Sequence, residues 1–351
     1  MTSSRRSRKQ VLFLLPWAAS PFMTTDIDLL SKHYPVDVLT YRGKRIKMTL
    51  QVLKRILQGR VGVIVFWFAV PSFGFGISIL ARLMRRPILL ITGGYDVANM
   101  PEIEFGSMIR PRLRRLVIGM LKMADTILTF SDYAQTEVRR YVQPRRMRTA
   151  YMGIDVERLR PSPAVARENM VITASSVGHA FIKQKGLDTF VRAAACVPDA
   201  QFVLIGKFVD ESIDELRRIA PPNVTFTGRF VTDEELADYY KRAKVYVQAS
   251  AHEGFGVALA EAMSAGCVPV AVRGTAMPEV VGDTGFYAPY GDAQALGAAI
   301  QQALADDGTC AAAARERIVA RFTVARRERV LVGEVGRLMR ARRRPKSPGM
   351  K

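Results

Sequence analysis

The hydrophobic positions of the chain form short runs rich in β-branched and aromatic residues, separated by stretches with helical periodicity. Apolar runs of this length that alternate with amphipathic segments are typical of parallel sheets covered by helices on both faces. The sequence therefore predicts two sets of strands, each in a doubly wound α/β domain. The expected strands are 11–16, 36–41, 61–68, 88–93 and 126–131 in the first half, and 170–176, 201–206, 224–228, 245–250, 268–272 and 285–289 in the second. The amphipathic segments of the second half are 186–197, 212–219, 233–242 and 257–265.

The boundary between the two domains is expected near residues 160–169, where two prolines and weak periodicity coincide with a change in charge. This places a first domain over residues 1–160 and a second over residues 161–335. A basic, proline-containing tail over residues 336–351 is expected to be disordered. Because doubly wound domains bind ligands at the carboxyl ends of their strands, the expected ligand site is a cleft between the domains.

Two apolar segments resemble export or membrane signals but are better explained as parts of the first domain. The start of the chain superficially resembles a signal peptide, yet Pro16 interrupts a short apolar core and polar residues follow at once. We therefore expect a first strand there. Residues 61–81 carry no charge and are long enough to span a membrane. Pro71, three glycines and the β-branched and aromatic residues favour a buried strand, a turn and a helix instead.

Composition limits the classes of site that the chain can build. Its 351 residues are enough for two domains with sizeable cores. The three cysteines form no closely spaced pair and the three histidines are far apart in sequence. A disulfide framework and a cysteine- or histidine-based metal site are therefore not expected, and a reducing, cytoplasmic location is.

The distribution of charge suggests an anionic partner for the first half of the chain. The formal net charge is +20; residues 1–160 hold 27 basic and 11 acidic side chains, whereas residues 161–330 hold 18 and 20. A phosphate-rich acceptor or an acidic membrane surface would explain the basic half. The alternative is a basic surface that is merely solvated.

The stretch 245–272 is the most informative candidate for chemistry, because a strand, a glycine-containing loop and a helix follow one another. Gly254 and Gly256 let the backbone approach a ligand, and the N–H groups at the helix start near Val257 favour an anion. Glu253 in the loop and Glu261 in the helix can accept paired hydrogen bonds from sugar diols. The alternative is a structural corner with two solvated glutamates.

The stretch 175–194 places Lys183 and Lys185 just before Gly186, where we expect a helix to begin. A lysine at this point can neutralise a diphosphate and the charge that develops when it leaves. Because a helix start slightly disfavours cations, a purely surface role is the weaker explanation. Asp26 and Asp28 have the D-x-D spacing of some metal sites, but a capping or solvated role on an opening helix is expected for them.

Several motifs together resemble family 4 of the retaining glycosyltransferases. Residues 253–256 (EGFG), followed by Glu261, match the E-x7-E signature of that family. The resemblance implies the GT-B fold, an α/β architecture of two doubly wound Rossmann-like domains facing a central cleft. Further motifs in the family's order are Ala124-Asp125 with Ser131, 151–155 (YMGID), 185–188 (KGLD), 204–206 (LIG), 224–228 (VTFTG) and 278–280 (PEV).

The resemblance also implies roles for individual residues of the second domain, which would bind a nucleotide-diphosphate sugar. Lys185 would stabilise the leaving diphosphate, Glu253 would contact the sugar, and Glu261 would bind the ribose hydroxyls. The other implied donor-binding residues are Gly254, Phe255 and Gly256 around the sugar, Val257 and Ala258 at the diphosphate, and Gly206 and the residues around Gly228 beside the base.

The chain departs from the family pattern at three places, one of which is residues 16–20 (PWAAS), where many members have a glycine-rich loop after the first strand. Where the family commonly has an arginine six residues before its lysine, this chain has His179, and Lys183 is the candidate for supplying the missing charge. After the fourth strand of the first domain, where many members carry a histidine, the turn ends in Asp96. Asp96 is therefore a candidate catalytic residue near the reacting centre, or a residue that only caps the turn.

The resemblance implies a retaining glycosyltransferase that moves a hexose-type sugar to a hydroxyl of a glycan or lipid-linked glycan, as in polysaccharide biosynthesis. No metal and no cofactor are expected, because the lysine and the helix would stabilise the leaving group. The expected partners are the donor, the acceptor and an anionic membrane surface on the inner face of the cell membrane, with no specific nucleic acid. The alternatives are a nucleotide-sugar epimerase of the same fold and a non-catalytic basic protein that binds nucleic acid or membrane surfaces.

Overall fold

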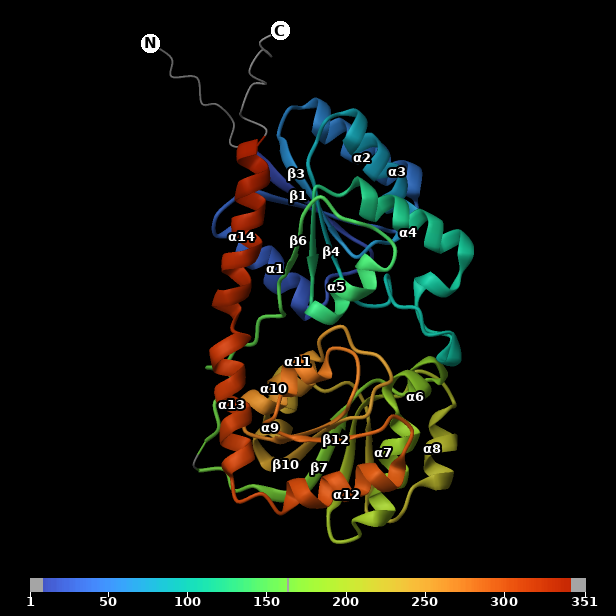
Figure 1. The fold of residues 1–351 in the computed structure, drawn as a ribbon, viewed down its shortest axis with the longest axis vertical. Coiled ribbons are helices and arrows are strands. Elements are labelled where there is room, and N and C mark those ends of the chain that lie inside the picture. The colour runs from blue at the N-terminus through green and yellow to red at the C-terminus, as the bar shows by residue number, and fades with distance from the viewer. Residues whose placement is uncertain (1–8, 163, 342–351) are drawn as a thin grey trace. The chain divides into compact units, whose positions relative to one another are not determined.

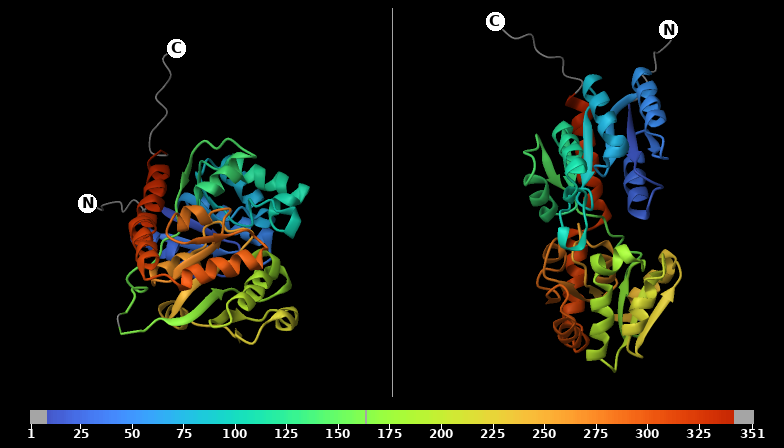
Figure 2. Two further views of the ribbon diagram at one scale, coloured as in Figure 1. Left: turned by 60° about the horizontal axis from the view of Figure 1, so that its bottom comes forward. Right: turned by 90° about the vertical axis from the view of Figure 1, so that its right-hand side faces the viewer.

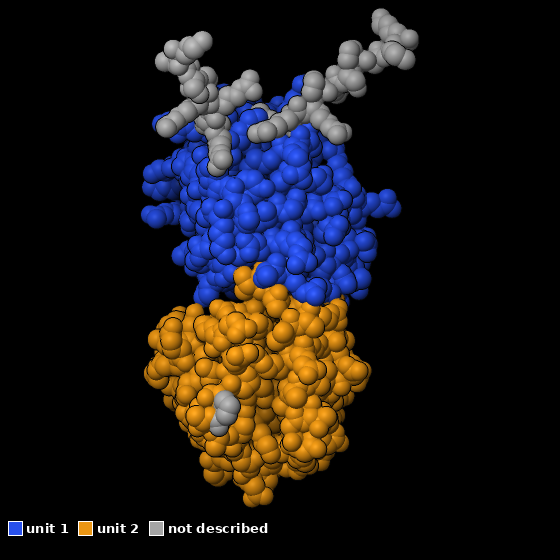
Figure 3. Space-filling model, turned by 90° about the vertical axis from the view of Figure 1, so that its left-hand side faces the viewer, with its two compact units in different colours: residues 1–151, 325–351 blue, residues 152–324 orange. Residues whose placement is uncertain are grey.

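The computed structural model describes residues 9–162 and 164–341, and the chain divides into two compact units (Figure 3). Unit 1 comprises residues 1–151 and 325–351, and unit 2 comprises residues 152–324. This division differs from the boundaries predicted near residues 160 and 335, because the last helix, α14 (Val324–Ala341), belongs almost entirely to unit 1. Residues 336–341 of the predicted tail are helical, and residues 342–351 lie outside the described residues.

Unit 1 contains a parallel six-stranded sheet in the order β2-β1-β3-β4-β5-β6 (Figure 1). The five predicted strands of the first half are confirmed. A sixth, β6, was not predicted, because its three half-exposed residues carry no apolar run. The strands are β1 (Gln10–Leu15), β2 (Val36–Thr40), β3 (Val61–Trp67), β4 (Ile88–Thr92), β5 (Thr126–Thr129) and β6 (Met147–Thr149).

Helices cover both faces of this sheet (Figure 1). The helices α2 to α5 bury apolar side chains against one face, among them Val52, Phe73 and Met120, and α1 and α14 lie on the other face. The uncharged segment 61–81 forms β3 and most of α3, as predicted, and no helix among the described residues is long and apolar enough to cross a membrane. The remaining elements are α1 (Pro21–Ser31), α2 (Arg45–Leu57), α3 (Pro71–Leu83), η1 (Pro101–Ile103), η2 (Ser107–Ile109), α4 (Pro111–Met123) and α5 (Asp132–Arg139).

Asp26 has a different environment from the one expected. It is fully buried in α1, and its carboxylate accepts hydrogen bonds from Arg327 of α14 at 2.5 and 2.6 Å and from the Trp67 indole at 3.0 Å. A capping or solvated role was therefore wrong for Asp26, whereas Asp28 is exposed. The local sequence does not show the arginine partner, which lies 301 residues away. Among residues 9–162 and 164–341, no three potential metal ligands are grouped together.

Unit 2 contains a second parallel sheet, in the order β12-β11-β10-β7-β8-β9, and all six strands predicted for the second half are confirmed. In two further views, each sheet lies between layers of helices (Figure 2). The strands are β7 (Glu168–Ala174), β8 (Gln201–Lys207), β9 (Val224–Gly228), β10 (Ala243–Gln248), β11 (Val268–Val272) and β12 (Phe286–Ala288).

Side-chain caps open some of the helices of unit 2. Before α9, the Thr232 hydroxyl accepts from the Glu235 N–H at 3.2 Å, and the Glu235 carboxylate accepts from the Thr232 N–H at 2.8 Å. This reciprocal capping box satisfies donors that a helix start leaves unpaired. The helical elements are α6 (His179–Lys185), α7 (Leu187–Ala193), η3 (Ala194–Cys196), α8 (Ile213–Ile219), α9 (Asp233–Arg242), α10 (Val257–Ser264), α11 (Met277–Val281), α12 (Ala293–Leu304) and α13 (Thr309–Arg321).

Candidate functional site

The strand order of unit 2 places two loops side by side at the carboxyl edge of its sheet. From β7 the chain proceeds through β8 and β9 to one edge, and β10 then pairs with the other side of β7. The order of the strands therefore reverses between β7 and β10. Ligands of doubly wound sheets bind at such a reversal, outside the carboxyl ends of the strands. The loops that meet here are residues 175–178 after β7 and residues 249–256 after β10.

A cluster of polar side chains converges on Glu253 in the second of these loops. The Lys185 ammonium lies 2.7 Å from Oε1 of Glu253, and the same oxygen accepts from Gln248 at 2.9 Å and from Ser250 at 2.8 Å. The Glu253 N–H donates to the Thr275 hydroxyl at 3.3 Å. Lys185 and Glu253 are each mostly buried, so the carboxylate and the ammonium are held in a fixed geometry.

Sequence reasoning identified Lys185 and Glu253 but missed the other members of this cluster. Gln248 ends β10 and Ser250 lies two residues beyond it, and both side chains are buried. Buried polar groups need hydrogen-bond partners, so polar residues at the end of this strand were the signal available in the sequence. For Thr275 there was no comparable signal, because it lies after the following strand and reaches Glu253 through the tertiary structure.

The two lysines before Gly186 have different environments. Both lie in the last turn of α6, a helix that was not predicted and that ends at Gly186. The expectation that they stand at an unfavourable helix start was therefore wrong, since cations are favourable in a last turn. Lys183 is exposed and pairs with Asp188 at 3.1 Å. The structure brings Lys185, and not Lys183, to the Glu253 carboxylate.

The loop after β10 turns sharply into α10, and its residues are suited to this turn. Gly256 caps the helix with φ 86°, a left-handed conformation that side chains disfavour. Val257 and Ala258 form the first turn of α10, where backbone N–H groups lack helical acceptors and favour an anion. The Phe255 ring is buried and packs edge-on against Phe322 with ring centroids 5.4 Å apart, so only the backbone of residues 254–256 is available to a ligand.

Glu261 lies in the second turn of α10, where burial raises its pKa to about 7. The Tyr240 hydroxyl donates to its carboxylate at 3.4 Å, and the Arg158 guanidinium, 3.8 Å away, opposes the rise by favouring the ionised form. A carboxyl group with this pKa changes its ionisation near neutral pH. Glu261 is mostly buried, so the alternative explanation of a solvated glutamate does not apply to it.

The raised pKa of Glu261 predicts a pH dependence of stability. Between the ordinary pKa of 4.5 and the folded value of about 7, the folded protein holds a proton that the unfolded chain has released. The free energy of unfolding should therefore fall as pH rises through this window, by on the order of 3 kcal/mol from this group. Urea unfolding at pH 5, 6, 7 and 8 measures the slope. Glu261→Gln should show a shallower decrease, and parallel curves for both proteins would contradict the assignment.

The remaining predicted donor residues lie at the carboxyl ends of β8 and β9. Gly206 is near the end of β8, where a Cβ atom would come within 2.1 Å of the Ser175 carbonyl oxygen, so only glycine fits. Gly228 ends β9. Beyond these strands, Val209 and Phe230 expose large apolar side chains at the same edge of the sheet. Exposed apolar side chains beside a polar site suit the face of a planar base.

His179 begins α6 and is exposed, and its backbone N–H donates to the Asp210 carboxylate at 3.0 Å. Asp210 holds the first turn of α6 in this way and also accepts from the Ser212 N–H at 3.0 Å. Hydrogen bonding from Ser212, and then from the His179 N–H, lowers the pKa of Asp210. The structure thus gives the backbone of His179 a defined partner, and Asp210 is a residue that sequence reasoning missed.

Asp96 lies in unit 1 and is almost completely buried after β4. Its carboxylate accepts hydrogen bonds from the Thr92 hydroxyl, from the Gly94 N–H at 3.1 Å and from the Ala69 N–H at 2.9 Å. Burial raises its pKa, while these hydrogen bonds act in the opposite direction. Donors of its own turn and of the chain after β3 surround the carboxylate, which fits the turn-capping alternative.

The second half of the chain matches a known family, and curated relatives match parts of the chain. Residues 169–306 match the family model described as glycosyl transferases group 1. Over 78 residues the chain is 45% identical to the O-antigen chain mannosyltransferase B of Escherichia coli, which covers 22% of this chain and 20% of that protein. Over 248 residues it is 26% identical to the GDP-mannose:cellobiosyl-diphosphopolyprenol alpha-mannosyltransferase of Xanthomonas oryzae pv. oryzae, covering 67% and 62% respectively. The chain thus spans less than two thirds of the length of these relatives.

Solved structures resemble the chain over nearly its whole length. A sucrose-phosphate synthase from Thermosynechococcus elongatus has a TM-score of 0.77 and 22% identity, covering 95% of this chain and 100% of that chain. HepE from Anabaena, solved in complex with UDP and glucose, has a TM-score of 0.75 and 19% identity with the same coverage. At this identity the likeness concerns the fold, and it confirms the predicted pair of Rossmann-like domains. The chain has the GT-B fold, and its residues 169–306 match the glycosyl transferases group 1.

Proposed function

We propose that the protein is a retaining, metal-independent glycosyltransferase. It transfers a sugar from a nucleoside-diphosphate sugar to a hydroxyl group of a glycan or lipid-linked glycan. The observation that carries the proposal is the contact of Lys185 with Glu253 beside the start of α10, at the reversal of strand order in unit 2. The match of residues 169–306 to the glycosyl transferases group 1 covers these residues and supports it.

Each part of this site has a role in binding and activating the donor. The first-turn N–H groups of α10, from Val257 and Ala258, bind the diphosphate. Lys185 offsets the negative charge that grows on the diphosphate as the glycosidic bond breaks. Glu253 remains oriented by Gln248 and accepts hydrogen bonds from sugar hydroxyls. The acceptor hydroxyl then attacks from the face that the diphosphate leaves, which retains the configuration of the anomeric carbon.

The nucleoside part of the donor occupies the region between α10 and the ends of β8 and β9. Glu261 accepts hydrogen bonds from the ribose hydroxyls, and these favour its ionised form. Phe230 and Val209 offer apolar surface to the base. Two of the relatives compared above are mannosyltransferases by name, one of them named for GDP-mannose. GDP-mannose is therefore the first donor to test.

Binding of nucleotides in the presence of EDTA tests the donor site. Calorimetric titration with GDP, UDP, ADP, CMP and NAD should reveal selective binding of one nucleoside diphosphate. This binding should be lost or strongly weakened in Lys185→Ala and in Glu261→Ala. If the folded wild-type protein binds none of these nucleotides, the proposed donor site is wrong.

Product analysis tests the reaction itself and separates it from its alternatives. With the matching nucleotide sugar and a panel of glycan and lipid-linked acceptors, NMR of the product should show an anomeric configuration equal to that of the donor. Inversion would contradict the retaining mechanism, and loss of all activity in EDTA would contradict metal independence. An epimerase would convert the nucleotide sugar and release no glycosylated product. A nucleic-acid-binding protein would show strongly salt-dependent polynucleotide binding with no sugar dependence.

We also propose that unit 1 binds an anionic membrane surface through α2. Three large apolar side chains of this helix are exposed, Ile46 by 69%, Leu50 by 59% and Leu57 by 68%. Exposed basic residues accompany them on the same helix, namely Arg45, Lys47 and Lys54, whereas Arg55 is paired with Asp37. A helix that combines exposed apolar and basic side chains suits the interface of an anionic bilayer.

Co-sedimentation with vesicles measures this association. Binding of the wild-type protein should increase with the fraction of anionic lipid and decrease with salt. Ile46→Ser combined with Leu50→Ser should weaken binding at least fivefold, because the apolar contribution is removed. The matched control is Val319→Ser, which removes an exposed apolar side chain from α13 of unit 2. Equal vesicle binding by all three proteins would rule out α2 as the contact surface.

A further inference from the structure

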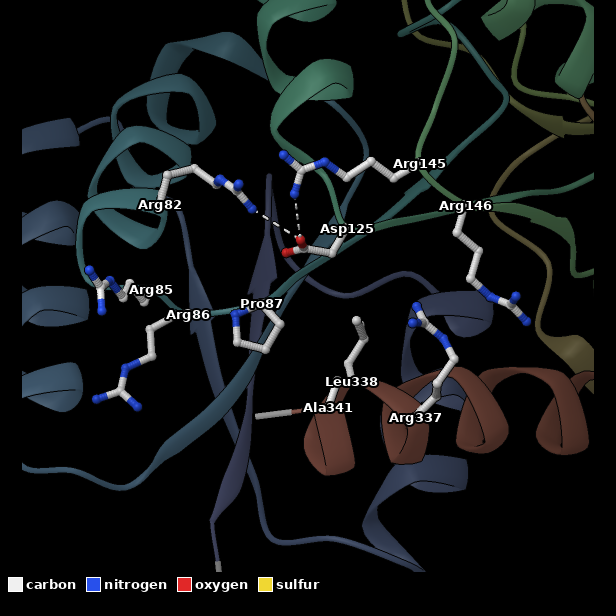
Figure 4. A pocket seen from close by; sticks show the side chains of 10 residues that line it. All are labelled: Arg82, Arg85, Arg86, Pro87, Asp125, Arg145, Arg146, Arg337, Leu338 and Ala341. Atoms are coloured by element: carbon white, nitrogen blue, oxygen red, sulfur yellow. Dashed lines mark hydrogen bonds and ion pairs between the residues drawn. The ribbon is translucent and has the colours of Figure 1, made fainter. Parts of the chain in front are cut away.

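Unit 1 contains a second basic feature that the proposed reaction does not use, a pocket of about 610 Å³ (Figure 4). Six arginines line it, and Asp125 is the acidic residue among its lining side chains. Segments far apart in sequence contribute these residues: the end of α3 with the chain that leads to β4, the residues just before β5 and β6, and the last turns of α14. The arginines are Arg82, Arg85, Arg86, Arg145, Arg146 and Arg337.

The pocket lies at the edge of the sheet where the strands begin. Pro87 directly precedes β4, Asp125 directly precedes β5, and Arg146 directly precedes β6. Ligand sites of doubly wound sheets lie at the opposite edge, outside the carboxyl ends of the strands. The pocket is therefore separate from any substrate site that the fold itself predicts for this unit.

Two of the arginines mainly hold the surrounding structure together. Arg86 is buried and donates to the carbonyl oxygens of Val61 and Ile56, each at 3.3 Å. Arg146 forms a bidentate pair with Glu334 of α14, at 2.8 and 2.6 Å. These two side chains anchor the surrounding backbone, so they are not the groups that we expect to bind a ligand.

The other arginines combine preorganisation with accessibility. Arg82 and Arg145 both donate to Oδ1 of Asp125, at 3.0 and 3.4 Å, and the Ile88 N–H holds the other carboxylate oxygen at 2.9 Å. Figure 4 shows Arg82 and Arg145 reaching Asp125 from different elements, with Arg337 projecting from α14. Arg337 is ordered by hydrogen bonds to Glu334, at 2.9 Å, and to the Thr126 hydroxyl. Arg145 is 61% exposed, and Arg82 and Arg337 are each more than a third exposed.

The charges of the pocket do not balance. Six guanidinium groups line it, whereas Asp125 and the adjacent Glu334 supply two carboxylates. One aspartate shared by two arginines orders both side chains but neutralises only one of them. A surplus of fixed positive charge in a concave, partly buried site concentrates multiply charged anions. Guanidinium groups bind phosphate oxygens in bidentate fashion, so phosphate-bearing ligands suit the pocket best.

We propose that this pocket binds an anion carrying two or more phosphate negative charges, such as a diphosphate or a phosphomonoester. Arg82, Arg145 and Arg337 are its ligand-binding residues. The phosphate belongs either to a free small molecule or to the headgroup of a lipid, since the chemistry of recognition is the same. Binding here does not depend on the proposed glycosyl transfer, because the pocket shares no residue with the site around Lys185 and Glu253.

Titration of the full chain with inorganic pyrophosphate tests the proposal. The measurement is made in a Lys185→Ala background, so that binding at the proposed donor site is weakened and the two sites are distinguished. Arg82→Ala combined with Arg145→Ala should reduce pyrophosphate affinity at least tenfold. The matched control is Arg112→Ala combined with Arg114→Ala, which removes the same charge from exposed positions of α4. Affinity in this control should change less than twofold.

Two further variants and measurements keep the result interpretable. Thermal unfolding shows whether each variant is folded, and Arg145→Ala alone replaces the double variant if that one is not. Arg145→Lys should bind pyrophosphate more weakly than wild type but more strongly than Arg145→Ala, because it keeps the charge and loses the bidentate geometry. Pyrophosphate binding that is absent in the Lys185→Ala background, or equal in the pocket and control variants, would overturn the proposal.

The source of the phosphate is decided with vesicles. The vesicles contain phosphatidate, and the protein carries Ile46→Ser and Leu50→Ser so that binding through α2 is weakened. If the ligand is a lipid headgroup, free pyrophosphate should displace the protein from these vesicles, and Arg82→Ala combined with Arg145→Ala should abolish the remaining binding. If pyrophosphate binds to the protein but does not displace it from the vesicles, the ligand of the pocket is a free anion. Sulfate at equal concentration should bind more weakly in both cases, because it carries less charge than pyrophosphate.

Discussion

Replacing Lys185 by alanine is expected to lower the turnover of glycosyl transfer by about 10²–10³-fold, the loss typical of removing one group that stabilises developing negative charge. The Lys185 ammonium lies 2.7 Å from Glu253 and beside the start of α10, where we place the diphosphate. The diphosphate of the intact donor carries less charge than the departing nucleoside diphosphate. The variant should therefore lose more in kcat than in affinity for the donor.

The comparison with Lys183→Ala makes this prediction specific. Lys183 is two residues away, exposed and paired with Asp188 at 3.1 Å, so its removal should change turnover less than threefold. Steady-state kinetics with the donor identified by nucleotide binding gives kcat and KM for both variants. Glu253 keeps its hydrogen bonds from Gln248 and Ser250 when Lys185 is removed, which favours an intact site. Equal losses in the two variants would mean that the lysines contribute only general positive charge.

Replacing Asp26 by alanine should lower the free energy of unfolding of unit 1 by about 3–5 kcal/mol, the range found when one partner of a buried ion pair is removed. Both side chains of the pair are almost completely inaccessible to solvent. Without Asp26, the Arg327 guanidinium would remain buried without a carboxylate, although it would still donate to the carbonyl oxygens of Ala150 and Tyr151 and lie 5.8 Å from the centroid of the Trp67 ring. An uncompensated buried charge is the origin of the expected loss.

Two variants test this explanation. Asp26→Leu combined with Arg327→Met removes both charges and should be less destabilising than Asp26→Ala, because no charge remains unpaired. Asp214→Ala breaks an exposed pair with Arg217 and should change the free energy of unfolding by less than about 1 kcal/mol. Urea denaturation followed by circular dichroism measures all four proteins. A loss for Asp26→Ala as small as that for Asp214→Ala would contradict the predicted role of the pair.

The fold was predictable because the buried strands of a parallel sheet are continuous apolar runs. Each of the eleven runs proposed from the sequence corresponds to a strand, since strands covered on both faces need apolar side chains on both. The strand β6 escaped this reasoning because it is three residues long and half-exposed. Likewise, α6 was not predicted, because its seven residues are too few to establish a helical period.

The candidate site was predictable only where its residues lie close together in sequence. The loop and helix around Glu253 and Glu261 were recognisable, because glycines, carboxylates and a helix start follow one another within a few residues. The sequence did not show which of the two lysines reaches the site. In the tertiary structure Lys183 pairs with Asp188, whereas Lys185 pairs with Glu253.

By itself, the sequence determined two doubly wound sheets, the loops that carry the candidate site and the basic character of the first half. The tertiary structure decided which distant residues meet. It joins Asp26 to Arg327, which are 301 positions apart, buries Glu261 so that its pKa rises, and gathers six arginines at the beginning of β4, β5 and β6. The physical reason is that periodicity and local spacing report on neighbours along the chain. Burial, charge pairing and the shape of a pocket depend on contacts that exist only once the chain has folded.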